Sequence, residues 1–209
     1  MVAVENLEEH LLARLRTHEM VRVPASEAEY LAMAPGFPHK LEYHNGEIVA
    51  MSLASALHEL IVSYLNYLLV GYFHDKDFLV TNSNAGLQIP RPDGSYYQPD
   101  LMVTQGQWAF KKGSNAIITN PYLIVEVMSP GTSKYDQEDK LPMYKDVATL
   151  QYAVYVARDR PYVTVYERTD QPDVWKNTDS KTLDSTARLG ELSLPLREIY
   201  HKITFPANR

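Results

Sequence analysis

Three acidic residues, Glu42, Asp100 and Glu126, lie in or next to short segments whose sequences predict β-strands. The segment around Glu126 reads YLIVEVM (residues 122–128), so apolar residues surround this carboxylate along the chain. A buried carboxylate without a partner costs several kcal/mol, and folds that keep one normally supply a cation. No lysine or arginine stands within five residues of Glu126. The cation must therefore come from elsewhere in the fold or from solution.

A lysine follows these acids, because Lys140 lies in the segment that predicts the next helix after the Glu126 strand. Two or three carboxylates from neighbouring strands and one lysine are the groups that a magnesium-dependent phosphodiesterase needs. The carboxylates hold a metal ion, which polarises a phosphoryl oxygen and lowers the pKa of a bound water. The ammonium orients that water or balances the charge at phosphorus. These residue types favour metal-assisted hydrolysis of a phosphodiester, in which a divalent ion and Lys140 neutralise Glu126.

Each of these residues also has an ordinary structural interpretation. Glu126 fits a strand carboxylate paired with a lysine or arginine across the sheet, and Asp100 fits a strand-entry residue that accepts a turn amide. Glu42 lies in a hairpin arm, where glutamate is common on the exposed face. Lys140 stands next to acidic residues and fits a solvated helix position. These interpretations stay open beside the catalytic one.

Two further residues, Asp136 and His58, are of types that could take part in catalysis or metal binding. Asp136 is expected to cap a helix over residues 137–148, with Pro142 in the first turns of that helix. His58 begins the stretch HELIV, but the zinc-protease motif needs a second histidine where Val62 stands, so that class is excluded. The sequence also lacks a glycine-rich phosphate loop and a Gly-x-Ser-x-Gly elbow.

Periodicity and turn signals predict the elements that position these residues. An apolar stripe predicts a helix over residues 4–19, and a capping box of Ser26 and Glu29 predicts a short helix over 27–33. Asn45-Gly46 predicts a two-residue hairpin turn, because both turn positions need positive φ. A further helix is expected over residues 55–73. Its buried side is predicted to carry Leu57, Leu60, Ile61, Tyr64, Leu65, Leu68 and Leu69.

The remainder of the chain predicts short strands. They are expected at residues 78–83, 85–90, 100–104, 122–128, 150–157 and 161–168, with short strands and a closing segment after residue 175. The stretch PRPDGSYYQP (90–99) is expected to be a loop. This order predicts an α/β or α+β fold with a mixed β-sheet flanked by helices. We expect a single domain over residues 1–209, in which residues 1–25 form an N-terminal helical extension.

The composition excludes several classes of protein. Apolar residues make up 45% of the 209 residues and charged residues 22%, which is typical of a globular chain and not of a disordered one. The absence of cysteine excludes disulfides, thiolate catalysis and cysteine-type zinc sites. Charges run through the first twenty residues, and no apolar run is long enough for a membrane helix, so we expect a cytoplasmic protein without a membrane segment. The net charge of −6 counts against a dedicated nucleic-acid binder, although acids at a metal site contribute to it.

Three stretches of the sequence carry a family resemblance. They are QPDLMVT, the region from NPYLIVEVMSPGTSKYDQEDKLPMYKD to LQYAVYVARDRPYVTVYER, and the upstream LEYHNGEIVAMSLASALHELIVSYL. Together they resemble the Uma family of restriction-endonuclease-like proteins, within the PD-(D/E)xK nuclease superfamily, over roughly residues 27–200. The resemblance implies a restriction-endonuclease-like core with metal ligands Asp100 and Glu126 and a supporting acid, Glu42. The superfamily pattern has a lysine two residues after the second acid. In this chain Met128 stands at that position, and the resemblance implies that Lys140 on the following helix takes its role.

Two hypotheses of different classes follow. The first is a Mg²⁺- or Mn²⁺-dependent endonuclease-like phosphodiesterase acting on DNA, with Asp100, Glu126, Lys140 and Glu42 as catalytic residues. Such an enzyme is expected to be a homodimer, because cutting both strands takes two sites related by a two-fold axis. The second is a catalytically inactive nuclease fold that binds nucleic acid or protein. The acidic net charge and the residue at position 128 favour the second hypothesis.

Overall fold

A computed structural model describes residues 4–92 and 94–205 of the chain. Its elements in chain order are α1 (Val4–Leu15), β1 (Met20–Pro24), α2 (Glu27–Met33), β2 (Leu41–His44), β3 (Glu47–Met51), α3 (Ala56–Phe73), β4 (Phe78–Asn82), β5 (Gly86–Ile89), β6 (Ser95–Tyr97), β7 (Leu101–Gln105), β8 (Ile117–Ile118), β9 (Pro121–Met128), η1 (Tyr135–Lys140), α4 (Leu141–Lys145), β10 (Tyr152–Ala157), β11 (Val163–Arg168), β12 (Trp175–Ser180), β13 (Thr186–Leu189), β14 (Leu192–Pro195) and α5 (Leu196–Ile199). None of the helices in this part of the chain has the length and apolar character needed to cross a membrane.

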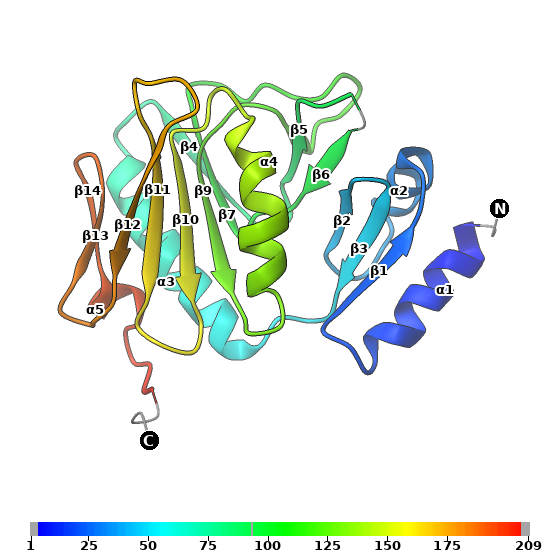
Figure 1. The fold of residues 1–209 in the computed structure, drawn as a ribbon, viewed down its shortest axis with the longest axis horizontal. Coiled ribbons are helices and arrows are strands. Elements are labelled where there is room, and N and C mark those ends of the chain that lie inside the picture. The colour runs from blue at the N-terminus through cyan, green and yellow to red at the C-terminus, as the bar shows by residue number, and fades with distance from the viewer. Residues whose placement is uncertain (1–3, 93, 206–209) are drawn as a thin grey trace.

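The N-terminal strands form a six-stranded sheet in the order β1-β3-β2-β6-β5-β8 (Figure 1). The predicted hairpin is confirmed, since Asn45 and Gly46 join β2 to β3 with φ of 48° and 82°. The predicted capping box is also confirmed, because Ser26 Oγ accepts a hydrogen bond from Glu29 N while the Glu29 carboxylate accepts one from Ser26 N. Helices α1 and α2 bury their apolar sides against one face of this sheet.

A second six-stranded sheet, β12-β11-β10-β9-β7-β4, contains Glu126 in its strand β9. Strands β9 and β10 are parallel, whereas β9 and β7 are antiparallel, so the sheet is mixed as predicted. Helix α3 covers one face of this sheet and packs on Leu123, Val125 and Val127 of β9. The alternate residues Ile124 and Met128 belong to the core on the opposite face. The predicted fold class is confirmed, although the structure has two large sheets where the sequence predicted one.

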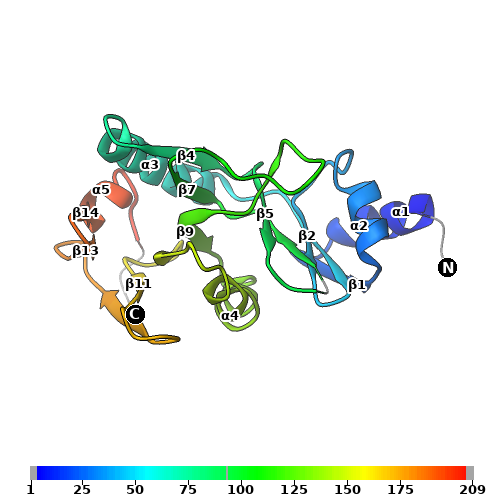
Figure 2. The ribbon, with the colours of Figure 1, turned by 90° about the horizontal axis from the view of Figure 1, so that it is seen from above.

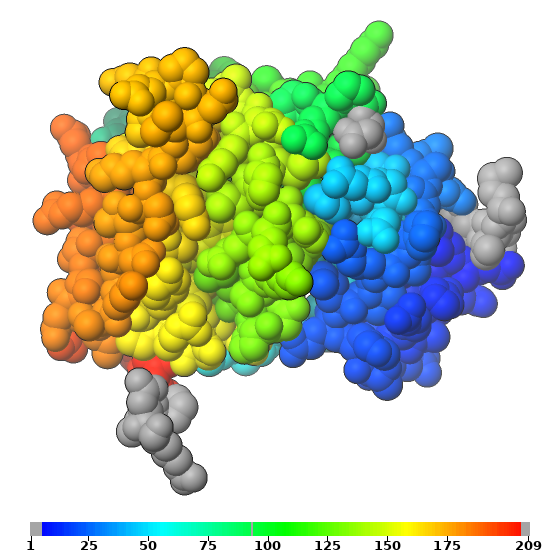
Figure 3. Space-filling model, in the orientation of Figure 1, coloured from blue at the N-terminus to red at the C-terminus, as the bar shows by residue number. Residues whose placement is uncertain are grey.

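The connection from β9 to β10 is a helical segment, η1 followed by α4, that lies between the two sheets (Figures 1 and 2). Leu141, Met143 and Tyr144 of this segment share one apolar core with β9 and β10 and with Val49 and Tyr97 of the N-terminal sheet. On the face shown in Figure 3, the yellow-green residues of the segment fill the space between the two sheets. A side chain on this segment can therefore contact both sheets at once.

Two predicted boundaries near the N-terminal sheet are wrong. The helix expected over 4–19 ends at Leu15, and Met20–Pro24 forms β1, which pairs with β3. The alternation of Val21 and Val23, both buried, is the strand signal that the helical stripe before it obscured. The stretch expected to be a loop over 90–99 contains β6 (Ser95–Tyr97), because three buried residues suffice for a strand between β2 and β5 although Pro and Gly surround them.

The predicted buried side of α3 is partly wrong. Ile61, Leu65 and Leu69 are buried as expected, but Leu57 and Leu60 are 36% and 37% exposed. The buried positions instead extend to Val62 and Phe73. Leu57 and Leu60 belong to neither the core cluster under α3 nor the residues packed against it, so they lie on the side of the helix that faces away from the sheet.

The predicted cap at Asp136 is also wrong. The helix begins earlier than expected, and Asp136 lies inside the π-helical turn η1 with its side chain buried. In this turn the Leu141 N–H donates to the Asp136 carbonyl, which widens the helix just before Pro142, a residue without an N–H of its own. The segment that was predicted to end with residue 148 ends at Lys145.

Candidate functional site

Glu126 points from β9 toward the helical segment between the sheets. One of its carboxylate oxygens, Oε1, lies 2.5 Å from Lys140 Nζ and accepts a hydrogen bond of 2.5 Å from the Tyr144 hydroxyl. The other oxygen, Oε2, lies 3.9 Å from Lys40 Nζ. The buried carboxylate in the apolar strand is therefore neutralised by lysines that are distant in sequence, one on η1 and one just before β2.

Asp100 stands immediately before β7 and shares the Lys40 ammonium with Glu126. Its Oδ1 lies 3.2 Å from Lys40 Nζ. Its Oδ2 accepts a hydrogen bond of 2.7 Å from Val127 N and lies 3.1 Å from His58 Nε2, in the first turn of α3. Each carboxylate thus has one oxygen fixed by the protein, while Asp100 Oδ1 and Glu126 Oε2 both face Lys40.

Glu42 completes the set from the N-terminal sheet. Its Oε1 lies 3.2 Å from Lys140 Nζ and accepts from Gln98 N at 2.9 Å, and its Oε2 accepts from the Tyr135 hydroxyl at 3.0 Å. Asp136 Oδ1 lies 3.3 Å from the same Lys140 ammonium. The Lys140 side chain is fully buried at the centre of three carboxylates.

Burial and charge act in opposite directions on the pKa values of these groups. Burial alone would raise the pKa of Asp100, but Lys40, His58 and the Val127 N–H outweigh burial and hold this pKa far below its usual range. Burial dominates at Glu126 and raises its pKa to about 7, against the attraction of Lys140 and Lys40. A further positive charge next to Glu126 would therefore favour its ionised form.

The remaining groups show the same competition. Burial lowers the pKa of Lys140, but Glu126, Glu42 and Asp136 outweigh it and raise this pKa well above the usual value. Burial likewise lowers the pKa of His58, and its hydrogen bond to Asp100 outweighs burial and raises it. Lys140 is therefore a permanent ammonium, and its charge balances the acids around it.

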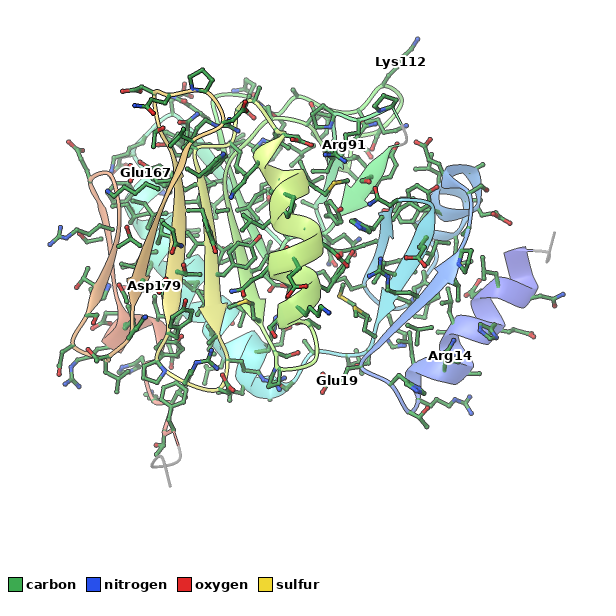
Figure 4. All side chains as sticks on the ribbon, viewed as in Figure 1. Arg14, Glu19, Arg91, Lys112, Glu167 and Asp179 are labelled. Carbon is green, nitrogen blue, oxygen red and sulfur yellow. The ribbon has the colours of Figure 1, made fainter. Side chains whose placement is uncertain are left out.

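A pocket of about 1200 Å³ opens beside the two carboxylates. Its described lining includes Asp100, Glu126, Lys40 and His58, whereas neither Lys140 nor Glu42 belongs to it. Glu19 and Lys112 also line the pocket, and Figure 4 shows them near the bottom and the top of the view, so the pocket extends along the molecule. Asp100 and Glu126 line this pocket, whereas Lys140 contacts Glu126 from outside the pocket lining.

The donor set can be tested against the divalent ion that the sequence implies. Within residues 4–92 and 94–205, no group of three or more His, Asp or Glu residues is arranged to hold a metal ion. Magnesium, however, is commonly bound by one or two carboxylates that share it with waters and substrate phosphates. Asp100 Oδ1 and Glu126 Oε2 already converge on one cation, the ammonium of Lys40. The two carboxylates therefore fit a Mg²⁺ or Mn²⁺ ion of this kind.

The structure brings together all four residues that the sequence singled out, and it adds others. Lys40 was missed, although it stands just before β2 and two positions before Glu42, a spacing that places side chains on one side of an extended chain. His58 was considered only as a zinc ligand, and Asp136 only as a cap. The hydroxyls of Tyr135 and Tyr144 also contact the acids. Helical spacing from Lys140 was the signal that could have placed Asp136 and Tyr144 near it.

Comparison with known proteins identifies the relatives of this chain. The model of the Uma2 family, described as "Putative restriction endonuclease", matches residues 27–197. Two uncharacterized proteins of Synechocystis sp. are similar: sll1609 is 33% identical over 59% of this chain and 70% of its own, and slr1290 is 32% identical over 71% and 76%.

The fold also has a counterpart among solved structures. A crystal structure from Anabaena variabilis, described as a putative nuclease belonging to DUF820, has a TM-score of 0.68 and 18% sequence identity. The alignment covers 87% of this chain and all of the other, and at this identity it demonstrates a common fold. Since the family model spans most of the sequence, including every described residue that contacts Asp100, Glu126 or Lys140, the chain belongs to the Uma2 family.

Proposed function

We propose that this protein is a divalent-metal-dependent, endonuclease-like phosphodiesterase that acts on DNA. The observation that carries the proposal is the convergence of Asp100 Oδ1 and Glu126 Oε2 on one cation position at the wall of a large pocket. Membership of a family described as "Putative restriction endonuclease" supports a nuclease. The fold shared with a structure described as "a putative nuclease" is consistent with it.

In this proposal Asp100 and Glu126 hold Mg²⁺ or Mn²⁺. When bound, the ion supplies Lewis-acid polarisation of a phosphoryl oxygen and lowers the pKa of a coordinated water. His58 and the Val127 N–H orient Asp100 through its second oxygen. Lys140 orients Glu126 in the same way and balances the charge of the site, and Glu42 fixes the Lys140 ammonium.

The pocket has features that suit the phosphate backbone of a nucleic acid. Lys111, Lys112 and Arg158 contribute positive charge to its lining, although the chain as a whole is acidic. The N-terminus of α3 also opens at the pocket, with Ser55 as its cap, and the positive end of a helix dipole attracts anions. These groups line the same pocket as the two carboxylates, so a phosphodiester bound in this pocket could reach the proposed metal.

The test is nicking of supercoiled plasmid in the presence of Mg²⁺ or Mn²⁺. We expect Asp100→Asn and Glu126→Gln each to abolish the metal-dependent activity, while circular dichroism shows a folded protein. Glu138→Gln is the control, because this glutamate lies on η1 outside the described pocket lining, with its side chain 65% exposed. Nicking that continues undiminished in both site variants would show that these carboxylates are not catalytic.

A specific observation also supports a second function, a nuclease fold that binds nucleic acid or protein without catalysis. Lys40 and Lys140 together neutralise Asp100 and Glu126 without any metal, and Lys140 is sealed from the pocket. Calorimetry with Mn²⁺ separates the two functions. Millimolar Mn²⁺ that binds to the wild type and not to Glu126→Gln supports the enzyme, and the absence of binding supports the second function.

The proposal includes a homodimer, since cleavage of both DNA strands takes two sites related by a two-fold axis. Light scattering after gel filtration measures the mass directly against the 23.8 kDa of one chain. A mass of one chain, with and without DNA, would restrict the enzyme to nicking one strand at a time.

A further inference from the structure

The ammonium of Lys40 already occupies the position between the two carboxylates. Asp100 Oδ2 and Glu126 Oε1 are occupied by His58, the Val127 N–H, Tyr144 and Lys140. The oxygens that remain for a metal, Asp100 Oδ1 and Glu126 Oε2, lie 3.2 and 3.9 Å from Lys40 Nζ. A divalent ion that binds these two oxygens would therefore need the position that the Lys40 ammonium occupies.

We propose that Lys40 is an exchangeable internal cation that holds the space between Asp100 and Glu126 in the absence of metal, and that a divalent ion binds by displacing its side chain into the pocket. The inference rests on the metal site of the proposed function and deepens it. It assigns separate roles to two lysines, one fixed and one exchangeable.

Burial distinguishes the two lysines. The side chain of Lys140 is 0% exposed, contacts three carboxylates and lies outside the pocket lining, so it has no route out of the site. The side chain of Lys40 is 21% exposed and lines the pocket. A flexible stem of four carbons carries its ammonium, so the ammonium can move while the backbone stays in place.

The backbone at Lys40 is itself anchored. The Lys40 carbonyl accepts a hydrogen bond of 3.0 Å from Met51 N, and the next residue, Leu41, begins β2 with its N–H bound to Gln98 Oε1 at 3.2 Å. The exchange therefore requires a rotamer change and no change of fold. It replaces one positive charge by two beside a pair of carboxylates, which favours the metal once it is present in sufficient concentration.

The first experiment measures Mn²⁺ affinity by calorimetry in the wild type and in Lys40→Gln. Removal of the competing ammonium is expected to tighten Mn²⁺ binding by about tenfold, because the ion no longer displaces a charge in direct contact with its ligands. Lys181→Gln is the matched control, since it removes an exposed ammonium outside the described pocket lining, and the Mn²⁺ affinity of this variant should stay at the wild-type value.

The second experiment uses the wild type alone and remains informative if Lys40→Gln does not fold. Lysines are acetylated with an N-hydroxysuccinimide ester with and without Mg²⁺, and the labelling rate of each lysine is read by peptide mass spectrometry. We expect Mg²⁺ to increase the labelling rate of Lys40, while Lys112 serves as the internal reference and does not change.

The outcomes separate this inference from the function on which it rests. If neither form binds Mn²⁺, the metal site fails and the inference fails with it. If the wild type binds Mn²⁺ and Lys40→Gln binds it equally or more weakly, or if Mg²⁺ leaves the labelling of Lys40 unchanged, the metal site stands and Lys40 is not its competitor.

Discussion

Lys140 is the residue on which the stability of the site depends most directly. Its buried ammonium lies within 3.3 Å of Glu126, Glu42 and Asp136. The removal of one partner from a buried ion pair leaves uncompensated charge and costs roughly 3–5 kcal/mol. We therefore expect Lys140→Met to lower the free energy of unfolding by about that amount, as measured by urea denaturation.

A surface lysine provides the comparison. Lys176 pairs with Glu167 at 3.4 Å, but its side chain is 64% exposed. Lys176→Met makes the same chemical change in water, where an ion pair contributes about 0.5 kcal/mol or less. Equal losses in the two variants would mean that the Lys140 network contributes no more than a surface pair.

His44 gives the protein a pH dependence that is independent of the carboxylates at the pocket. It is buried in β2, with Nδ1 2.6 Å from the Tyr97 hydroxyl, and burial lowers its pKa below the ordinary 6.5. The unfolded chain then takes up a proton below pH 6.5 while the folded protein does not. The stability that neutral His44 contributes is present above this pH and is lost as the pH falls below it.

The corresponding measurement is urea denaturation of the wild type and of His44→Gln at about pH 7.5 and about pH 5.5. The wild type is expected to lose more stability on acidification than the variant. Identical losses would assign the acid sensitivity to other groups.

At the level of single elements, the cap of α3 is a defined contribution to stability next to the site. Ser55 Oγ accepts from His58 N at 3.2 Å and from Arg158 at 3.2 Å. Loss of a serine cap costs about 1 kcal/mol, so Ser55→Ala should lower the free energy of unfolding by that amount. Ser63→Ala in the same helix is the control, because Ser63 donates to the Glu59 carbonyl and alanine is the better helix former.

The elements with local signals were predictable from the sequence. The Ser26–Glu29 capping box and the Asn45-Gly46 turn depend on a few adjacent residues, and both were confirmed. Strand β6 was missed because its stability comes from pairing with β2 and β5, which no local pattern shows. Caps and tight turns are encoded by adjacent residues, whereas a short strand depends on the neighbouring strands with which it pairs.

The same distinction applies to the site. Glu126 was recognisable because a charge in an apolar strand needs a partner. Lys140 was recognisable because it follows the strand on the next helix, whereas Lys40 lies far from Glu126 in the sequence, and only the packing of the two sheets brings it to Glu126. Asp136 was misassigned because the helix begins before it, so its side chain lies inside the helical segment and contacts Lys140.

At the level of the whole molecule, the proposed function predicts that the position of the positive charges determines how DNA approaches. Lys112 extends outward from the loop after β7 and lines the pocket (Figure 4). Lys112→Glu is expected to weaken DNA binding and to reduce the salt dependence of log Kd by about 0.9 for each phosphate that the protein no longer neutralises. Lys181→Glu makes the same charge change on an exposed residue outside the described pocket lining.

Fluorescence anisotropy over a range of salt concentrations measures both quantities. Equal weakening by the two substitutions would mean that net charge, and not the pocket, governs binding.

The position of Lys140 between the two sheets has a consequence for how the protein opens. Its ammonium joins Glu42 of one sheet to Glu126 of the other, inside an apolar core that both sheets share. Separation of the sheets would expose that core and leave Glu42 without its cation, so we expect the two sheets to unfold together. Amide hydrogen exchange in β2 and β9 should accordingly report one common opening event, and a fragment that contains either sheet alone should not persist as a folded unit.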